Sequence, residues 1–228
     1  MHKLLVSLLF IITLFTSCKK EKQLISNEDS YTLSILIDNN EGNKVYIQKL
    51  LSPTEIDSTI VKNGISTFVG QISYPERYIL TIETVFGGKM FILENDSINI
   101  HIKNNNLMNA TIQNSKINYE LISVQKESER IYNKIDLLFP VLQRARLEND
   151  AISLKDISNK MSLIEQENIN FHFSYASKNP NSFISAMILN DLSKRDTIVR
   201  NKISKIYSLF SMEVKKSEDS KVMNTLIK

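Results

Sequence analysis

The spacing of hydrophobic residues changes once along this chain, near residue 114, and this change constrains the fold more than any other feature. Before it, apolar residues alternate with polar ones in short runs, as at Tyr31, Leu33 and Ile35. After it, apolar residues recur every three or four positions. A period of two is that of a half-buried strand, and a period near 3.6 is that of an amphipathic helix. We therefore predict an α+β fold, with an N-terminal antiparallel β-sandwich over residues 31–113 and an α-helical array over residues 114–228.

Turn signals divide the N-terminal part into about eight short strands. The expected strands cover residues 31–37, 44–50, 56–62, 65–69, 77–85, 89–93, 97–103 and 110–113. Asn63-Gly64 predicts a tight hairpin because both residues tolerate positive φ, and we expect a second turn at Gly87-Gly88. Short strands separated by regular turn signals are typical of an antiparallel sandwich.

Four helices and the start of a fifth are expected in the C-terminal part. The first begins after Ser115 and ends or kinks near Pro140, because proline interrupts helical hydrogen bonding. Its apolar stripe consists of Ile117, Leu121, Val124, Ile131, Ile135 and Leu138. Ser153 and Asp156 have the spacing of a capping box, which predicts the start of a second helix. A third helix should follow Ser182, a fourth should run from about residue 196 to 210, and residues 221–228 should open one more.

A short hydrophobic segment lies at the N-terminus. Residues 4–15 carry no charge and follow Lys3. A helix of this length is too short to cross a hydrocarbon core of ~30 Å at ~1.5 Å per residue, but it suits the apolar part of a signal peptide. Thr16 and Ser17 come next, and then Cys18, after which a run of charged residues begins.

The segment that ends at Cys18 resembles a bacterial lipobox, with Phe15 where leucine is usual. The resemblance implies that residues 1–17 are removed as a lipoprotein signal peptide and that the thiol of Cys18 is alkylated with diacylglyceryl. Residues 18–30 would then be a tether. Lysine after the cysteine implies an outer-membrane lipoprotein, with its periplasmic or surface face left open. The alternatives are a buried N-terminal helix with a core cysteine and a secretory leader without lipid.

The composition bounds the chemistry. The formal net charge is +3 and the chain has no basic tract long enough to suggest a nucleic-acid partner. Cys18 is the single cysteine, so lipidation would leave neither a disulfide nor a C-x-x-C redox pair.

Three segments of the β-rich part resemble a domain of unknown function found at the N-terminus of envelope lipoproteins. They are residues 57–70, 74–80 and 91–98, with the sequences DSTIVKNGISTFVG, YPERYIL and FILENDSI. In those proteins the domain precedes a helical linker and a TlpA/ResA-like thioredoxin domain. Residues 178–186 (KNPNSFISA) and 215–217 (KKS) resemble the linker.

This chain departs from that family at several places. Ser66 stands where the family has a large apolar residue, and Asn114-Ser115 replaces Gly-Ser. The sequence ends where the thioredoxin domain is expected and contains no W-C-x-x-C segment, so the oxidoreductase chemistry of the family is carried over to no residue here.

The residues give no catalytic, cofactor-binding or metal-binding site. His101 and His172 have no other ligand at zinc spacing, and we expect one on the solvent side of a strand and the other on a helix surface. Aromatic residues could line a groove at the sandwich edge, although core packing is the better interpretation. These residues are Tyr74, Tyr78, Phe86 and Phe91.

We therefore expect a non-catalytic, membrane-anchored envelope lipoprotein that acts as a binding or interaction module and needs no cofactor. Its partners would be the membrane, through the lipidated N-terminus, and an envelope protein or glycan. The alternative is a truncated thiol-disulfide oxidoreductase that has lost its catalytic thioredoxin domain.

Overall fold

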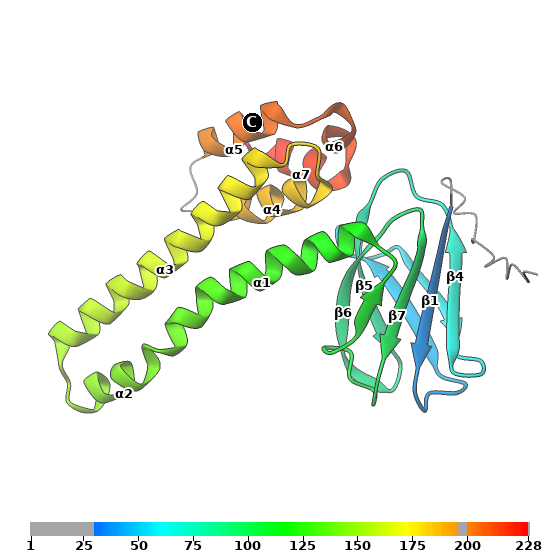
Figure 1. Cartoon of the computed structure of the whole chain (residues 1–228), viewed down its shortest axis with the longest axis horizontal. Coiled ribbons are helices and arrows are strands. Elements are labelled where there is room, and N and C mark those ends of the chain that lie inside the picture. The colour runs from blue at the N-terminus through cyan, green and yellow to red at the C-terminus, as the bar shows by residue number, and fades with distance from the viewer. Residues whose placement is uncertain (1–29, 196–199, 228) are drawn as a thin grey trace, which may run out of the picture.

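A computed structural model of the chain describes residues 30–195 and 200–227 (Figure 1). The strands are β1 (Tyr31–Ile37), β2 (Lys44–Lys49), β3 (Ile56–Ile60), β4 (Ile65–Gly70), β5 (Glu76–Ile82), β6 (Val85–Leu93), β7 (Ser97–Ile102) and β8 (Thr111–Gln113). The helices are α1 (Lys116–Asp136), α2 (Phe139–Leu147), α3 (Ala151–Lys178), α4 (Phe183–Ser193), α5 (Arg200–Leu209), α6 (Met212–Lys216) and α7 (Glu218–Ile227). Strands come first and helices follow, so the predicted α+β class is confirmed.

Some of the predictions fall outside the described residues. These are the signal peptide at 1–17, the lipidated Cys18, the tether at 18–30 apart from its last residue, and the start of the fourth helix at Asp196.

The described strands form two four-stranded sheets, with the orders β4-β1-β7-β8 and β3-β2-β5-β6. All neighbouring strands are antiparallel except β1 and β7, which are parallel. The predicted antiparallel sandwich is therefore confirmed except at this one pair, which is parallel. A parallel pair needs a long crossover, and here the five strands between β1 and β7 supply it, four of them in the other sheet.

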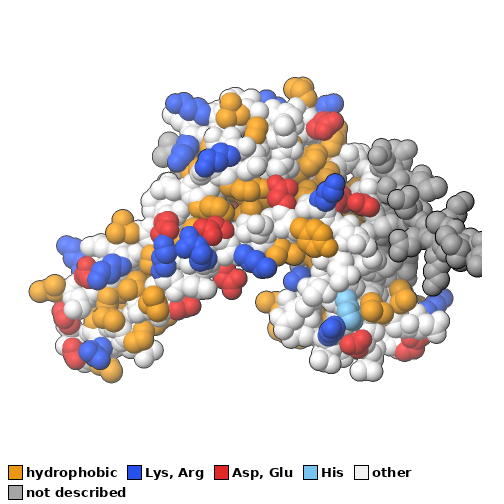
Figure 2. All heavy atoms as spheres, viewed as in Figure 1, with side chains coloured by type: hydrophobic (Ala, Val, Ile, Leu, Met, Phe, Trp, Pro, Cys, Tyr) orange, Lys and Arg blue, Asp and Glu red, His pale blue; other side chains and the backbone are white. Residues whose placement is uncertain are grey.

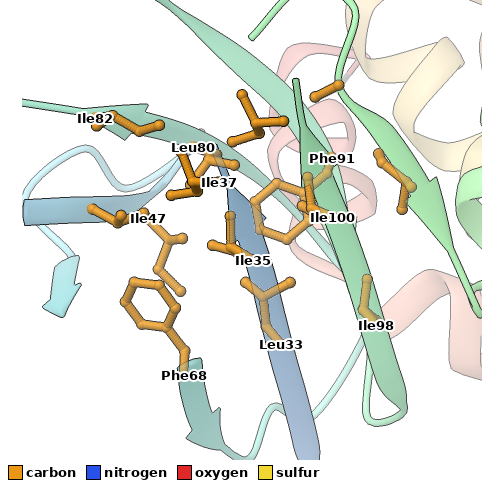
Figure 3. Packing of buried hydrophobic residues seen from close by; sticks show 14 of the residues in the cluster. Leu33, Ile35, Ile37, Ile47, Phe68, Leu80, Ile82, Phe91, Ile98 and Ile100 are labelled. Atoms are coloured by element: carbon orange, nitrogen blue, oxygen red, sulfur yellow. The ribbon is translucent and has the colours of Figure 1, made fainter. Parts of the chain in front are cut away.

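The core of the sandwich follows from the period of two. In β1, Leu33, Ile35 and Ile37 are buried while Thr32 and Leu36 are exposed. Figure 3 shows buried side chains of both sheets converging on one layer between them, with the ring of Phe91 among them. Each such aliphatic or aromatic side chain contributes roughly 1.5–3 kcal/mol when it leaves water, so this layer holds the sheets together.

The two turn predictions have opposite outcomes. Asn63 and Gly64 have φ of 53° and 73°, as a tight two-residue hairpin turn requires, so that prediction is confirmed. The turn expected at Gly87-Gly88 is wrong. The chain turns at residues 83–84, and the two glycines lie within β6 at a register shift between β5 and β6. Gly87 has φ of +95°, so the glycine pair accommodates a bulge close to the turn.

Helix boundaries in the C-terminal part depend on caps and on Pro140. The first helix ends at Asp136, and Pro140 lies in the first turn of α2, where a missing N–H costs nothing. The second long helix begins earlier than predicted. Its N-cap is Asp150, whose carboxylate accepts from the backbone N–H of Ile152 and Ser153. The capping box predicted at Ser153 is therefore wrong, because the stronger carboxylate acceptor stands three residues earlier.

Helices α4–α7 form a second core with the inner ends of α1 and α3. Most of α4 is buried, including Ile184, Met187 and Leu189. Ile92 of β6 belongs to this helical cluster, so the helices pack on the outer face of the β3-β2-β5-β6 sheet. The short helix α6 was not predicted from the sequence, because five residues give no readable period.

Helices α1 and α3 extend away from the sandwich as an arm, with α2 at its far end (Figure 1). Figure 2 shows hydrophobic side chains gathered at this end of the arm. They include Leu137, Val141, Leu147 and Ile152, which are 52–85 % exposed.

Candidate functional site

Strand β6 forms one edge of its sheet, and the first turn of α1 closes only part of that edge. The side-chain oxygen of Asn118 accepts from the backbone N–H of Ile92 at 2.9 Å. Its Nδ2 donates to the backbone carbonyl of Ile92 at 2.7 Å. The carboxamide of Asn118 thus satisfies both backbone groups of one strand residue, as the peptide groups of a neighbouring strand would.

Local interactions at the start of α1 hold Asn118 in place. Ser115 is the N-cap, and its hydroxyl accepts from both the backbone N–H and the Nδ2 of Asn118, at 3.2 Å and 2.8 Å. The same hydroxyl donates to Oε1 of Glu94 in the segment that follows β6. Burial raises the pKa of Glu94 above its ordinary value, and the hydrogen bond from Ser115 opposes that shift. All these contacts join the end of β6 to the start of α1.

The next edge position of β6 is Met90. Backbone groups of alternate strand residues point to the same side, and the pairing of β5 with β6 runs without interruption from Met90 to Ile92. The N–H and carbonyl of Met90 therefore point away from β5, in the same direction as those of Ile92. Within residues 30–195 and 200–227, neither group has a hydrogen-bond partner.

An open cleft of about 190 Å³ lies beside Met90. Its walls come from β6, from the β8 region of the other sheet and from the first turns of α1. They are formed by Gly88, Lys89, Met90, Met108, Ile112, Asn118, Leu121, Ile122 and Gln125. An apolar cavity of ~150 Å³ accommodates a benzene ring, so this cleft has room for one side chain or a short stretch of main chain.

Lys89 is the charged residue of the cleft wall. Its Nζ donates to the backbone carbonyl of Met108 at 3.1 Å. Burial lowers the pKa of this ammonium. In the described part of the chain, no carboxylate oxygen lies within 4 Å of Lys89 Nζ. A half-buried ammonium that lacks a counter-charge favours an incoming carboxylate.

These groups suit binding rather than bond-breaking. The cleft offers one open donor and one open acceptor of an edge strand, one ammonium and an apolar wall of leucine, isoleucine and methionine side chains. Nothing among them forms a nucleophile and base pair.

A second polar contact joins the sandwich to the helices at Arg77 of β5. This side chain is 7 % exposed and forms ion pairs with Asp191 of α4 and Asp219 of α7. Asn190 Nδ2 also donates to Asp219, at 2.7 Å. Burial alone would lower the pKa of Arg77, but the two carboxylates outweigh it and the pKa is raised, so the guanidinium stays charged.

The two histidines lie apart and do not form a site. His101 lies on the outer side of β7, with Nε2 3.9 Å from Oδ1 of Asp38. His172 of α3 is half-buried beside Phe171 rather than fully on the helix surface. Burial, reinforced by the charge of Arg195, lowers the pKa of His172. Within the described residues, no group of three or more histidine, cysteine and acidic side chains is placed to hold a metal ion.

The four aromatic residues do not line a common groove. Phe91 is fully buried in the sandwich and packs near Tyr78 at a ring separation of 6.1 Å. Tyr74 instead packs against Phe183 of α4 at 6.3 Å. Phe86 is fully exposed, so the prediction of core packing is wrong for this residue.

Sequence reasoning missed the residues that form the cleft and those that form the polar contact between Arg77 and the helices. Asn118 and Arg77 are polar residues inside patterns that were interpreted as a helix start and a strand start. The one signal available is a polar residue at a position that is buried in the fold. This signal does not identify the backbone group or the carboxylate that the polar side chain contacts.

Among the described helices, none is both long enough and apolar enough to cross a membrane. No curated protein and no solved structure matches the chain significantly. Residues 31–121, which cover the sandwich and the first turns of α1, match the family model described as a domain of unknown function (DUF4369).

Proposed function

We propose that this chain is a non-catalytic binding module of the cell envelope, held at a membrane, most simply the outer membrane, by lipid on Cys18. The observation that carries the proposal is the cleft beside β6, where the backbone groups of Met90 and the ammonium of Lys89 are open to a partner. The partner class we favour is an envelope protein, because backbone groups of an edge strand recognise main chain. A glycan is the competing occupant.

The anchor follows from the sequence of the N-terminus. A single acyl chain holds a protein only reversibly at ~0.8 kcal/mol per buried CH₂, whereas several chains on one cysteine give durable attachment. The test is metabolic labelling with an alkyne fatty acid, followed by membrane fractionation. The wild-type chain should be labelled and sediment with membranes. Labelling that persists in Cys18→Ala would contradict the assignment.

The binding role is tested in intact cells by photocrosslinking from the cleft wall. We would place p-benzoylphenylalanine at Leu121, and at Leu163 as a matched control. Leu163 lies on α3 and is 70 % exposed. The proposal predicts a discrete adduct from position 121 that is absent from position 163, and mass spectrometry would show whether it contains protein or glycan. Adducts from both positions or from neither would contradict it.

The non-catalytic part of the proposal has its own test. A chain that accelerates the reduction of insulin disulfides by dithiothreitol, or that turns over any other substrate, would overturn the non-catalytic proposal. The measurement uses purified full-length protein in detergent with dithiothreitol as the reductant, and the same mixture without protein as the baseline.

A further inference from the structure

The first step concerns what Asn118 does to β6. Its carboxamide is a peptide-like group that bonds both the N–H and the carbonyl of Ile92. It therefore occupies the place that a fifth strand of the β3-β2-β5-β6 sheet would take. Asn118 is fully buried, and α1 continues away from the sheet, so the imitation of a strand ends after one residue.

The second step concerns where a real strand could continue. Met90 lies two residues before Ile92, with its N–H and carbonyl directed to the same side. Strand partners lie about 4.8 Å apart, and the cleft occupies this side of Met90. The bulge at Gly87-Gly88 disturbs the strand on the other side. Regular pairing is thus limited to a stretch centred on Met90, between Asn118 and the bulge.

The third step concerns the charge that the occupant should carry. Among the cleft-lining residues the charge comes from Lys89, and its Nζ has a carbonyl but no carboxylate as partner in the described part of the chain. The apolar side of the cleft is formed by Leu121, Ile122 and Ile112. An acidic group next to an apolar side chain complements this wall.

Resting on the proposed function, we propose that the cleft receives an extended peptide segment that pairs its backbone with Met90 as an added strand. A carboxylate of the segment binds Lys89. The added strand continues the pairing that Asn118 makes with Ile92. Because Asn118 already occupies the edge at Ile92, the segment must end there and takes a single register. Because the regular pairing is short, its specificity depends on the carboxylate as well as on the main chain.

The test uses full-length protein in detergent and a fluorescein-labelled heptapeptide of alternating threonine and valine with a central glutamate. Two matched peptides separate the contributions. One has glutamine in place of glutamate. The other is N-methylated at every peptide bond, so that neither edge of its backbone can donate to a neighbouring strand. Fluorescence anisotropy gives the Kd of each. A charge-assisted bond and a pair of backbone bonds each predict about a 5- to 10-fold loss of affinity when removed.

Three variants locate the binding. Lys89→Met should weaken the glutamate peptide to the level of the glutamine peptide and leave the glutamine peptide unchanged. Met90→Pro should weaken both unmethylated peptides, and it removes no bond within the sheet because the N–H of Met90 faces the cleft. Lys44→Met is the control, since Lys44 is an exposed lysine of β2 outside this cleft. Far-ultraviolet circular dichroism confirms that each variant is folded.

The outcomes distinguish this inference from the proposed function. Equal binding of the N-methylated and unmethylated peptides would overturn strand pairing, and equal binding of the glutamate and glutamine peptides by the wild type would overturn the contact with Lys89. Either result would overturn this inference, while the photocrosslink from Leu121 could still support a binding cleft. Absence of binding by all peptides at millimolar concentration would also overturn it. A dimer abolished by Met90→Pro would show that the edge pairs with a second copy and would equally overturn the proposal.

Discussion

Replacing Arg77 by methionine should destabilise the protein strongly, because it leaves a buried carboxylate without its cation. Asp219 has a side chain that is 4 % exposed and accepts from both Arg77 and Asn190. In Arg77→Met the carboxylate would keep only the amide of Asn190. Methionine preserves most of the volume of the arginine stem, so the loss measures charge and hydrogen bonding more than packing.

The magnitude follows from the burial of each partner. Breaking a buried ion pair by removing one member costs about 3–5 kcal/mol, since the remaining charge stays desolvated. The pair with Asp191 adds little, because that side chain is 56 % exposed and an exposed pair contributes about 0–1 kcal/mol. We therefore expect about 3–5 kcal/mol for Arg77→Met and under about 1 kcal/mol for Asp191→Asn.

The assay is urea unfolding followed by circular dichroism, with Arg130→Met as the matched control. Arg130 pairs with Glu127 on α1, and its side chain is 61 % exposed, so this change should leave the urea midpoint nearly unchanged. The double variant Arg77→Met/Asp219→Asn should recover part of the loss, because no charge is then left buried. A loss for Arg77→Met no larger than for the control, or no recovery in the double variant, would refute the reasoning.

Three further predictions concern buried polar groups. Asn118→Ala should cost about 2–3 kcal/mol, because both backbone groups of Ile92 lose their partner; urea midpoints check this, and a cost below that of an exposed substitution would contradict it. Ser66→Ala should raise the melting temperature, with a gain of about 1 kcal/mol, because the buried Oγ has no partner among the described residues; a lower melting temperature would contradict it. The lowered folded-state pKa of His172 means that the unfolded chain binds more protons below about pH 6.5, so stability should fall as the pH drops through that value. His172→Gln should reduce this fall between about pH 7.5 and pH 5.5 in urea titrations, and an unchanged fall would contradict the assignment.

The sequence predicts the elements of this fold well where burial and period agree. The strand with Leu33 and Ile35 and the hairpin at Asn63-Gly64 were found because each depends on neighbouring residues alone. The errors arise where contacts between residues far apart in the sequence decide the local conformation. Gly87-Gly88 carries a strong turn signal, yet the register with β5 places the turn earlier and turns the glycines into a bulge.

The sites could be predicted less well than the fold, for a physical reason. Asn118 meets Ile92, and Arg77 meets Asp219, which lies 142 residues further along the chain. No local sequence pattern indicates such a pairing, because a polar residue at a buried position can form its hydrogen bonds with many different partners. Ser66 is the exception, since its departure from the family pattern already marked a polar residue at an apolar position, and the structure places it in the sandwich core.

The ion pairs of Arg77 that join the helices to the sheet are separate from the cleft, and this affects how a partner could bind. Arg77 fixes α4 and α7 to the outer face of the sheet, while the cleft lies at the free edge of β6 under α1. Asn118 lies between the closed and the open part of this edge, because it bonds Ile92 and also lines the cleft. A side-chain amide can replace only one residue of a neighbouring strand, so the docking of α1 that covers Ile92 necessarily leaves Met90 open. The open edge is therefore a consequence of how the helices are attached, and a peptide could occupy it without breaking the ion pairs that hold the two units together.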